Sequence, residues 1–283
     1  IKPYLERKGI GFIADTVTRI DPHANKLELK EGDAVDYDYL VIATGAHLRP
    51  DETPGLESPE YGKTVHDFYT LDGAIALREK MKYFDKGRVV LNIAELPYKC
   101  PVAPIEFVFM ADWFFETKGA RDNVEIELVT PMAGAFSKPI ASSILGDIAI
   151  QKNIKVTPNF DIAQVNVEEK TIESHKGEKV DYDLLVAIPP NFGAKFLEGS
   201  GLEDPLRFVE TDHFTLKAKN AENIYVIGDA TNVPASKAGA VAHYTLLSVI
   251  PMLALILVGL SHFIGEEQLY NTILNNLKLV IPE

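Results

Sequence analysis

The single cysteine of the chain lies in a setting that favours thiol chemistry. Cys100 is part of Pro97-Tyr-Lys-Cys-Pro-Val-Ala-Pro104, directly after Lys99, and an apolar helix is expected to begin at Pro104 or Ile105. A neighbouring cation and a helix N-terminus both favour thiolate over thiol. The alternative, an inert buried cysteine, is common for a lone cysteine. We favour the reactive interpretation because the segment follows a predicted strand, where α/β proteins bind nucleotides.

A second segment has the residue types that hold an extended ligand. The apolar strand Ile224 to Ile227 runs into Gly228, Asp229 and Ala230. Glycine lets the backbone approach a ligand closely, and an aspartate carboxylate can accept a hydrogen bond from a ribityl hydroxyl. The small residues that follow, which include Lys237, Ala238 and Gly239, predict a helix start whose amides face an anionic group. This combination is typical of FAD-binding flavoproteins.

A third segment agrees with the second. Val35-Asp-Tyr-Asp-Tyr-Leu-Val-Ile-Ala-Thr-Gly45 is an apolar strand that ends in small residues, and such a strand can pass close to a flavin. The alternative is an ordinary parallel strand that ends in a glycine turn. We expect Thr44 and Gly45 to contact the cofactor because both segments occur in one chain.

An internal repeat indicates the elements that position these residues. Val35-Asp-Tyr-Asp-Tyr-Leu-Val-Ile-Ala43 aligns with Val180-Asp-Tyr-Asp-Leu-Leu-Val-Ala-Ile-Pro-Pro190, and each copy follows a predicted hairpin with a charged, glycine-containing turn. Two copies of one supersecondary unit imply two similar domains. The second copy has Pro189-Pro190 in place of Thr44-Gly45. Since proline stiffens the chain and removes a donor, this corner of the second domain has a different task.

The alternation of strands and helices predicts the α/β class, with two Rossmann-like domains built on doubly wound parallel sheets. We expect a discontinuous FAD-binding domain from residues 1–74 and 201–244, a second dinucleotide-binding-like domain from 75–200, and an apolar tail from 245–283.

One apparent dinucleotide fingerprint is misleading. Gly9-Ile-Gly11-Phe-Ile-Ala14 matches G-x-G-x-x-A by letter, but the fingerprint needs a strand before it and a helix after it. Here a helix precedes it, so we interpret Gly9 as the end of that helix and expect a strand over residues 9–17. The N-terminal βαβ unit that would hold the FAD pyrophosphate is therefore missing from the predicted first domain.

Composition limits the remaining classes. A net charge of −13 argues against nucleic acid as a partner and against attraction to anionic lipid. One cysteine excludes an internal disulfide framework and suggests a reducing compartment. The seven histidines have no ligand spacing, so no metal site is expected. The strand 88–93 lacks a following glycine loop, which argues against NAD(P) binding.

These motifs together resemble the sulfide:quinone oxidoreductases, a family of two-dinucleotide-domain flavoproteins. The resemblance rests on Thr44-Gly45, the Cys-Pro-x-Ala-Pro segment at 100–104, and the segments Gly228 to Thr231 and Ser236 to His243. It implies FAD as cofactor, Cys100 as a redox cysteine, and Pro101 and Lys237 beside the flavin, with sulfide and quinone as substrates. The chain departs from the family pattern because one sulfur cannot form an intramolecular disulfide.

The tail suits an acceptor that resides in a membrane. Residues 245–264 are almost uninterruptedly apolar, and about 20 such residues can span a bilayer. Pro251 and His262 favour a packed or interfacial helix instead. We expect a cytoplasmic protein at the periphery of the cell membrane, with membrane contact through this tail. The oligomeric state, including a homo-oligomer, is left open.

Two alternative functions remain open. An NADH:quinone flavoenzyme of type II would share the Thr-Gly and Gly-Asp elements. A non-catalytic, truncated member of the fold would explain the missing pyrophosphate cradle and the single cysteine.

Overall fold

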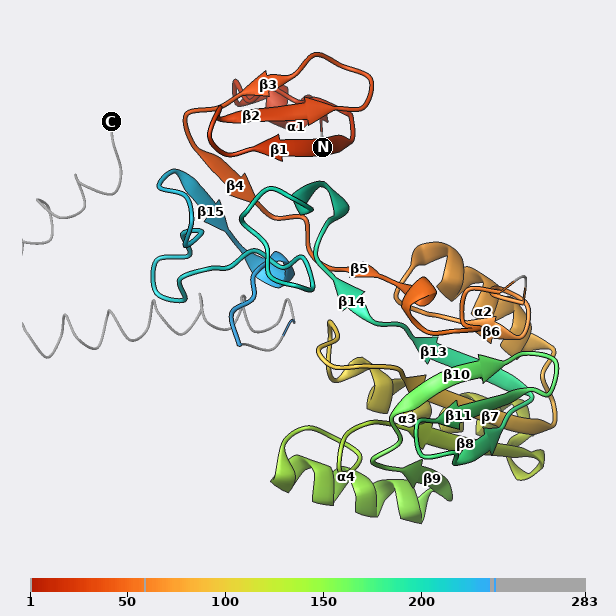
Figure 1. The fold of residues 1–283 in the computed structure, drawn as a ribbon. Helices are drawn as coiled ribbons and strands as arrows, with labels where there is room; N and C mark the ends of the chain where they lie inside the picture. The colour runs from red at the N-terminus through yellow and green to blue at the C-terminus, as the bar shows by residue number, and fades with distance from the viewer. Residues whose placement is uncertain (1, 59, 235–236, 238–283) are drawn as a thin grey trace, which may run out of the picture. The chain divides into compact units, whose positions relative to one another are not determined.

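The computed structural model describes residues 2–58, 60–234 and 237, and Figure 1 shows the order of the elements. The chain begins with α1 (Lys2–Arg7), which ends near Gly9 in a left-handed conformation (φ 73°). The amide of Gly9 donates to the carbonyl of Glu6. The predicted helix end at Gly9 is therefore confirmed.

Two antiparallel three-stranded sheets have the same construction. The first contains β1 (Val17–Asp21), β2 (Lys26–Leu29) and β3 (Val35–Asp36); the second contains β10 (Ile162–Asn166), β11 (Thr171–Ser174) and β12 (Lys179–Asp181). The register shifts near the start of the first strand in both sheets. Each sheet leads into a parallel strand, β4 (Leu40–Ile42) or β13 (Leu184–Ile188). The repeat in the sequence thus corresponds to a repeated supersecondary unit.

A five-stranded parallel sheet forms the centre of the middle region, in the order β6-β13-β7-β8-β9. Besides β13 it contains β6 (Val65–His66), β7 (Gly87–Ile93), β8 (Val124–Val129) and β9 (Ile154–Thr157). Parallel strands are usually covered on both faces and therefore form continuous apolar runs. All five residues of β13 are buried, as this rule expects.

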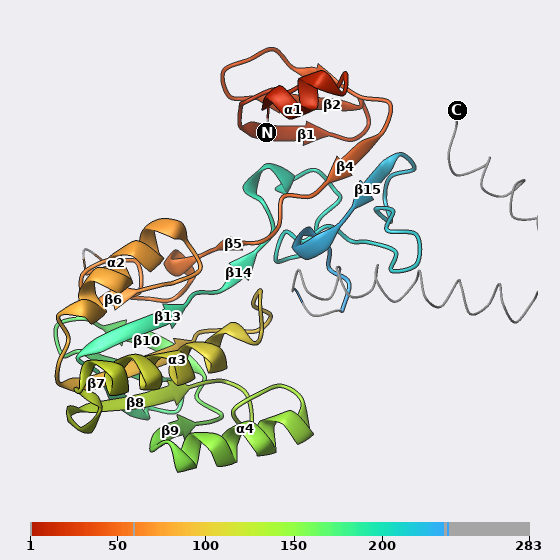
Figure 2. The same cartoon turned by 180° about the vertical axis from the view of Figure 1, so that it is seen from behind.

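The two faces of this sheet have different covers. On one face the core includes residues of α2 (Leu71–Lys82), α3 (Ala103–Lys118) and α4 (Pro139–Gln151). On the other face the core includes residues of β10, β11 and β12. The view from behind in Figure 2 shows the three helices along the sheet. The predicted α/β class with parallel sheets is confirmed, although an antiparallel sheet, not a helical layer, covers the second face.

Local sequence signals explain where these helices begin and end. The Thr70 hydroxyl accepts a bond from the Gly73 amide and caps α2, as N-cap residues do. Prolines occupy the first turn of α3 and α4, where a missing amide is harmless. Gly119 ends α3 with φ 72°, the left-handed conformation that favours glycine.

The other parallel pair joins segments that are far apart in the sequence. β15 (Ile224–Val226) pairs with β4, so that Ile224 lies opposite Leu40 and Val226 opposite Ile42. One face of this pair packs into a third core with Ile20, Leu197 and Val209. A two-stranded antiparallel ribbon is formed by β5 (His47–Leu48) and β14 (Asn191–Phe192). Short 3-10 helices are η1 (Pro50–Glu52), η2 (Arg121–Asn123), η3 (Lys195–Leu197) and η4 (Gly228–Ala230).

The strand predicted over residues 9–17 was wrong for most of its length. Only Val17 belongs to a strand, and residues 10–14 have no regular structure. Ile10, Phe12 and Ile13 are exposed. An alternating apolar pattern predicts a strand, but a strand also needs a neighbour for its backbone hydrogen bonds. Among the described residues, this segment pairs with no strand.

Candidate functional site

The Gly228 turn lies at the carboxyl end of β15. Gly228 has φ 66°, is exposed, and a Cβ added to it would meet no atom within 4 Å. Asp229 is half-buried. Ala230 is fully buried and anchors the turn to the core. The turn thus presents open backbone next to a carboxylate.

Parallel pairing brings Thr44 and Gly45 to the same edge. The amide of Ile227 donates to the carbonyl of Ile42 at 3.0 Å, so the ends of β4 and β15 remain adjacent. Thr44 is exposed, and Gly45 has φ 69° with nothing within 4 Å of an added Cβ. Two left-handed glycines at neighbouring strand ends leave unobstructed backbone, which fits the close approach of a flavin. The carboxyl ends of parallel strands are also where α/β folds bind ligands.

Cys100 lies in a strained turn just before α3. Cys100 is exposed, and its φ of 51° is unusual for a residue other than glycine. Its amide donates to the carbonyl of Lys237 at 2.6 Å, and its carbonyl accepts from the Ala103 amide at 3.0 Å and the Tyr69 hydroxyl at 3.2 Å. Burial raises the pKa of Tyr69 above its usual range. The helix α3 begins at Ala103, one residue before the predicted start at Pro104, and Pro101 lies in the turn.

Lys237 touches both segments. Its ammonium donates to the carbonyls of Asp229 at 3.0 Å and Thr231 at 2.7 Å, and it lies 3.8 Å from the centroid of the Phe208 ring. Burial lowers the pKa of Lys237, and the negative charge of Asp229 opposes this shift. The structure therefore brings together the cysteine and glycine turns that the sequence singled out separately.

Further contacts hold the cysteine turn, and sequence analysis missed them. The Lys99 ammonium donates to the carbonyl of Ala46 at 3.2 Å, and the Lys99 amide donates to the side chain of Asn191 at 3.2 Å. Ala46 directly follows Gly45, so the cysteine turn is linked to the end of β4 as well. Asn191 follows Pro189-Pro190, and no local motif marks it as a partner of Lys99.

A pocket of about 1280 Å³ lies beside Thr44 and is lined by both cations and anions. Within it, Arg49 and Arg207 lie 5.1 Å and 5.3 Å from the centroid of the Phe192 ring. Burial, followed by the charges of Lys99 and Arg207, lowers the pKa of His47 in its lining. Both arginines are also paired with carboxylates, Arg49 with Asp51 and Glu52 and Arg207 with Glu198, so this wall of the pocket is polar and carries charges of both signs.

The corresponding edge of the five-stranded sheet is closed. Tyr98 and Ala135 are buried after the strands β7 and β8, and Met132 packs into the same core. Burial raises the pKa of Tyr98 to about 12, and its hydroxyl donates to the carbonyl of Pro101. Side chains therefore fill the end of the sheet at which a glycine loop would leave room for a nucleotide.

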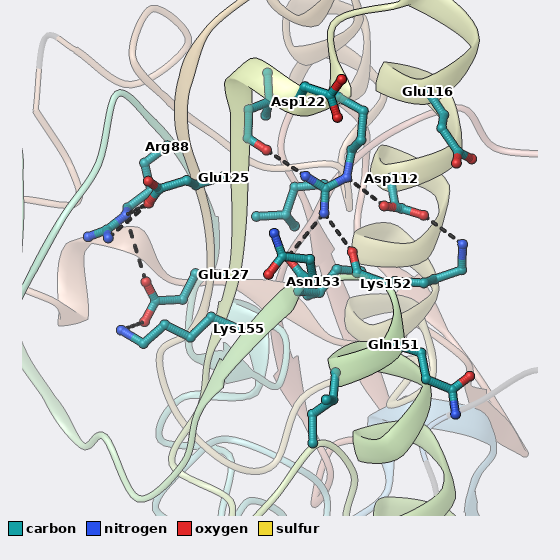
Figure 3. Close-up of a pocket in the computed structure, with 15 residues that line it drawn as sticks. Arg88, Asp112, Glu116, Asp122, Glu125, Glu127, Gln151, Lys152, Asn153 and Lys155 are labelled. Atoms are coloured by element: carbon teal, nitrogen blue, oxygen red, sulfur yellow. Dashed lines mark hydrogen bonds and ion pairs between the residues drawn. The ribbon is translucent and has the colours of Figure 1, made fainter.

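A second pocket, of about 880 Å³, lies at the opposite, amino ends of β7, β8 and β9 (Figure 3). Asp112 accepts bonds from Arg121 and Lys152 there, both at 2.6 Å. Arg121 also donates to the carbonyls of Val124, Lys152 and Asn153. This network joins α3, β8 and the end of α4. Its charged side chains are bonded to one another or to backbone carbonyls, so a structural role explains them without a ligand.

Several predicted features lie outside the described residues, namely Ala238, Gly239 and the tail 245–283. In the part of the chain that the structure describes, no helix is long and apolar enough to cross a membrane. Residues 2–58, 60–234 and 237 also contain no group of three or more His, Cys, Asp or Glu side chains that could hold a metal ion.

Curated proteins with similar sequences carry one recurring name. The chain is 29% identical over 238 residues to the mitochondrial sulfide:quinone oxidoreductase of Dictyostelium discoideum, and 25% identical over 238 residues to that of Mus musculus. Each alignment covers 82% of this chain and 53% of the relative. The chain thus spans about half the length of the curated relatives it matches. No family model matches it.

The fold comparison agrees. The crystal structure of the sulfide:quinone oxidoreductase from Aquifex aeolicus superimposes with a TM-score of 0.72 at 22% identity, covering 83% of this chain and 56% of that one. This match supports the α/β fold with Rossmann-like units that the sequence predicted. The resemblance indicated by the motifs is confirmed: the chain is similar in sequence and in fold to sulfide:quinone oxidoreductases.

Proposed function

We propose that this chain carries the sulfide-oxidising part of an FAD-dependent sulfide:quinone oxidoreductase. In the net reaction, hydrogen sulfide loses two electrons and its sulfur leaves at oxidation state zero. The quinone gains these two electrons and two protons and becomes the quinol. When bound, FAD supplies a two-electron carrier between a sulfur donor and a quinone.

The observation that carries this proposal is the shared contact between Cys100 and the Gly228 turn. Lys237 accepts the Cys100 amide bond and donates to the carbonyl of Asp229. A reactive sulfur and a flavin-binding turn must be neighbours if electrons are to pass between them. Their connection through one residue therefore favours a redox role for the cysteine over an inert one.

Each predicted contact has a distinct task in this proposal. Gly45 and Gly228 leave space for the ring system and the ribityl chain, while Thr44 and Pro101 border that space. The Asp229 carboxylate accepts a bond from a ribityl hydroxyl. Ala230 anchors the turn, and Lys237 is included as a cofactor contact, together with Ala238 and Gly239, which lie outside the described residues. The positive charge of Lys99, which is fixed near Ala46, favours an anionic sulfur donor such as hydrosulfide.

An NADH:quinone function is less well supported. Tyr98 and Met132 fill the end of the five-stranded sheet, and a nicotinamide cofactor would have to displace them. The non-catalytic alternative is favoured by the single cysteine, since one sulfur cannot form an intramolecular disulfide. It predicts that flavin binding or sulfide reactivity is absent, so the same experiment distinguishes it.

In this proposal, the apolar tail brings the protein to the membrane in which the quinone acceptor resides. Quinones of respiratory type reside in membranes, and residues 245–264 are apolar. We therefore include peripheral contact with the cytoplasmic side of the cell membrane through this tail.

The test is a visible absorption spectrum of the full chain with added FAD, followed by anaerobic sulfide and then a soluble quinone. Flavin absorbance that bleaches with sulfide and recovers with quinone is expected. Cys100→Ser is expected to bind FAD equally well and to lose at least about 100-fold in the rate of bleaching, as removal of a nucleophile usually does. Bleaching by NADH but not by sulfide would favour the alternative enzyme. A chain that retains no flavin would contradict the catalytic proposal.

A further inference from the structure

The sequence predicts that Lys237 lies beside the flavin, but this role does not explain the contacts that Lys237 makes within the protein. Its ammonium is already engaged by two backbone carbonyls, those of Asp229 and Thr231, and by the face of Phe208. A buried ammonium is costly unless hydrogen bonds compensate for the lost water. The carbonyls and the ring provide this compensation, and together they fix the side chain.

The backbone of the same residue acts on a different segment. The carbonyl of Lys237 accepts the amide of Cys100 at 2.6 Å. Cys100 has φ 51°, a conformation that is unfavourable for a side chain with a Cβ. Such a residue persists only when its surroundings hold it, and here the amide of Cys100 has its bond partner in Lys237.

The surroundings of the ammonium are packed and linked by hydrogen bonds. Phe208 is 2% exposed. The amide of Val209 donates to the carbonyl of Ala230 at 2.9 Å, and Asn232 returns a bond to the carbonyl of Val209 at 3.0 Å. The Gly228 turn is therefore attached to the segment that carries Phe208, and Lys237 lies against both.

We propose that Lys237 is a positioning residue: its ammonium fixes it to the Gly228 turn, and its carbonyl fixes Cys100 in the left-handed conformation. The functional importance of this role rests on the proposed function, because Lys237 gives the reactive sulfur a defined place beside the cofactor turn. The contacts that fix Lys237 and Cys100 are within the protein and do not depend on a bound flavin. Loss of the ammonium contacts loosens the Lys237 carbonyl, and the restraint on Cys100 weakens with it.

The single cysteine permits a direct test. The full chain labelled with 15N-cysteine gives one amide signal, that of Cys100, whose hydrogen exchange and chemical shift are measured without flavin or sulfide. In the unmodified protein we expect a protected amide. In Lys237→Met we expect exchange about tenfold faster, because the carbonyl that accepts the Cys100 amide is held less firmly and this hydrogen bond is weakened, and a changed chemical shift. Lys237→Arg keeps a donor and a charge and is expected to restore most of the protection.

The matched control is Lys217→Met. Lys217 also has an ammonium paired within the protein, to Glu222 at 3.1 Å, but it is on another segment. This variant is expected to leave the Cys100 signal unchanged. Equal acceleration in both Lys→Met variants, or none in Lys237→Met, would overturn the proposal.

Two further measurements test the proposal even if Lys237→Met does not fold. Lys237→Gln keeps a shorter, uncharged donor and is expected to give intermediate protection. In the unmodified protein, an unprotected Cys100 amide would itself contradict the inference. Since none of these signals depends on flavin or sulfide, the positioning role can fail while the proposed function stands, and the reverse also holds.

Discussion

The strands β4 and β13 follow the same supersecondary unit but end in opposite environments. β13 has parallel neighbours on both sides, β6 and β7, and is buried along its whole length. β4 pairs only with β15 among the described residues, and Val41 on it is 56% exposed. The strand β4 leads into Thr44-Gly45, and β13 leads into Pro189-Pro190. The comparison teaches that a repeated unit supplies a strand, while the neighbours of that strand decide whether it is buried in a core or lies at an exposed edge.

The largest expected effect follows from burial at the centre of β13. Leu185 is fully buried, and Leu185→Ala is expected to lower the free energy of unfolding by about 3 to 5 kcal/mol because it leaves a cavity. The matched change Val41→Ala is expected to cost less than about 1 kcal/mol at its exposed position. Denaturant unfolding measures both. Equal losses would show that the two strands do not differ in burial as described.

The next effect concerns the closed region and depends on pH. Burial opposes ionisation of Asp112, but bonds from Arg121 and Lys152 outweigh it and hold the pKa of Asp112 below its usual range. Asp112→Asn is expected to cost about 3 kcal/mol at pH 7, the lower end for a broken buried ion pair, since Lys152 remains partly exposed.

The sign of the pH dependence follows from this lowered pKa. The folded state holds the proton on Asp112 less tightly than the unfolded state, so the stabilisation is present above the unfolded value of about 4. It is lost as the pH falls through the folded pKa. The difference in stability between the unmodified protein and Asp112→Asn should therefore shrink in acid, which denaturant titrations at several pH values would measure. A constant difference down to pH 2 would argue against this origin.

A smaller effect is expected at the open edge. Gly228→Ala places a Cβ on a residue with φ 66°, although no neighbouring atom lies within 4 Å. The cost is backbone strain alone, about 1 to 2 kcal/mol in thermal unfolding. Gly177→Ala is a suitable control because φ there is 81° and its surroundings are equally open. Both variants should lose similar stability, but only Gly228→Ala should weaken the binding of added FAD. Unchanged FAD affinity would separate this turn from the cofactor site.

Much of the fold could be predicted because its signals are local. Apolar runs marked the parallel strands, Gly9 marked the end of the first helix, and the repeat around Val35 and Val180 indicated two copies of one unit. The segment 9–17 could not be predicted correctly, because the sequence pattern does not reveal whether a neighbouring strand is present to pair with it.

The candidate site was predictable in its parts but not in its connections. Residue types alone singled out Cys100, Gly45 and Gly228. The bond from the Cys100 amide to Lys237 could not be foreseen, since a backbone carbonyl leaves no mark on the sequence. The contact of the Asn191 side chain with the Lys99 amide could not be foreseen either, because the two residues are far apart in the sequence and no motif links them.

The lone thiol also limits what oxidation can do to this chain. Cys100 is exposed, and the sequence offers no second sulfhydryl. A molecule with one attachment point can be joined to one other molecule and no more. Disulfide cross-linking must therefore stop at pairs linked through Cys100 in each copy, and chains of disulfide-linked molecules cannot grow.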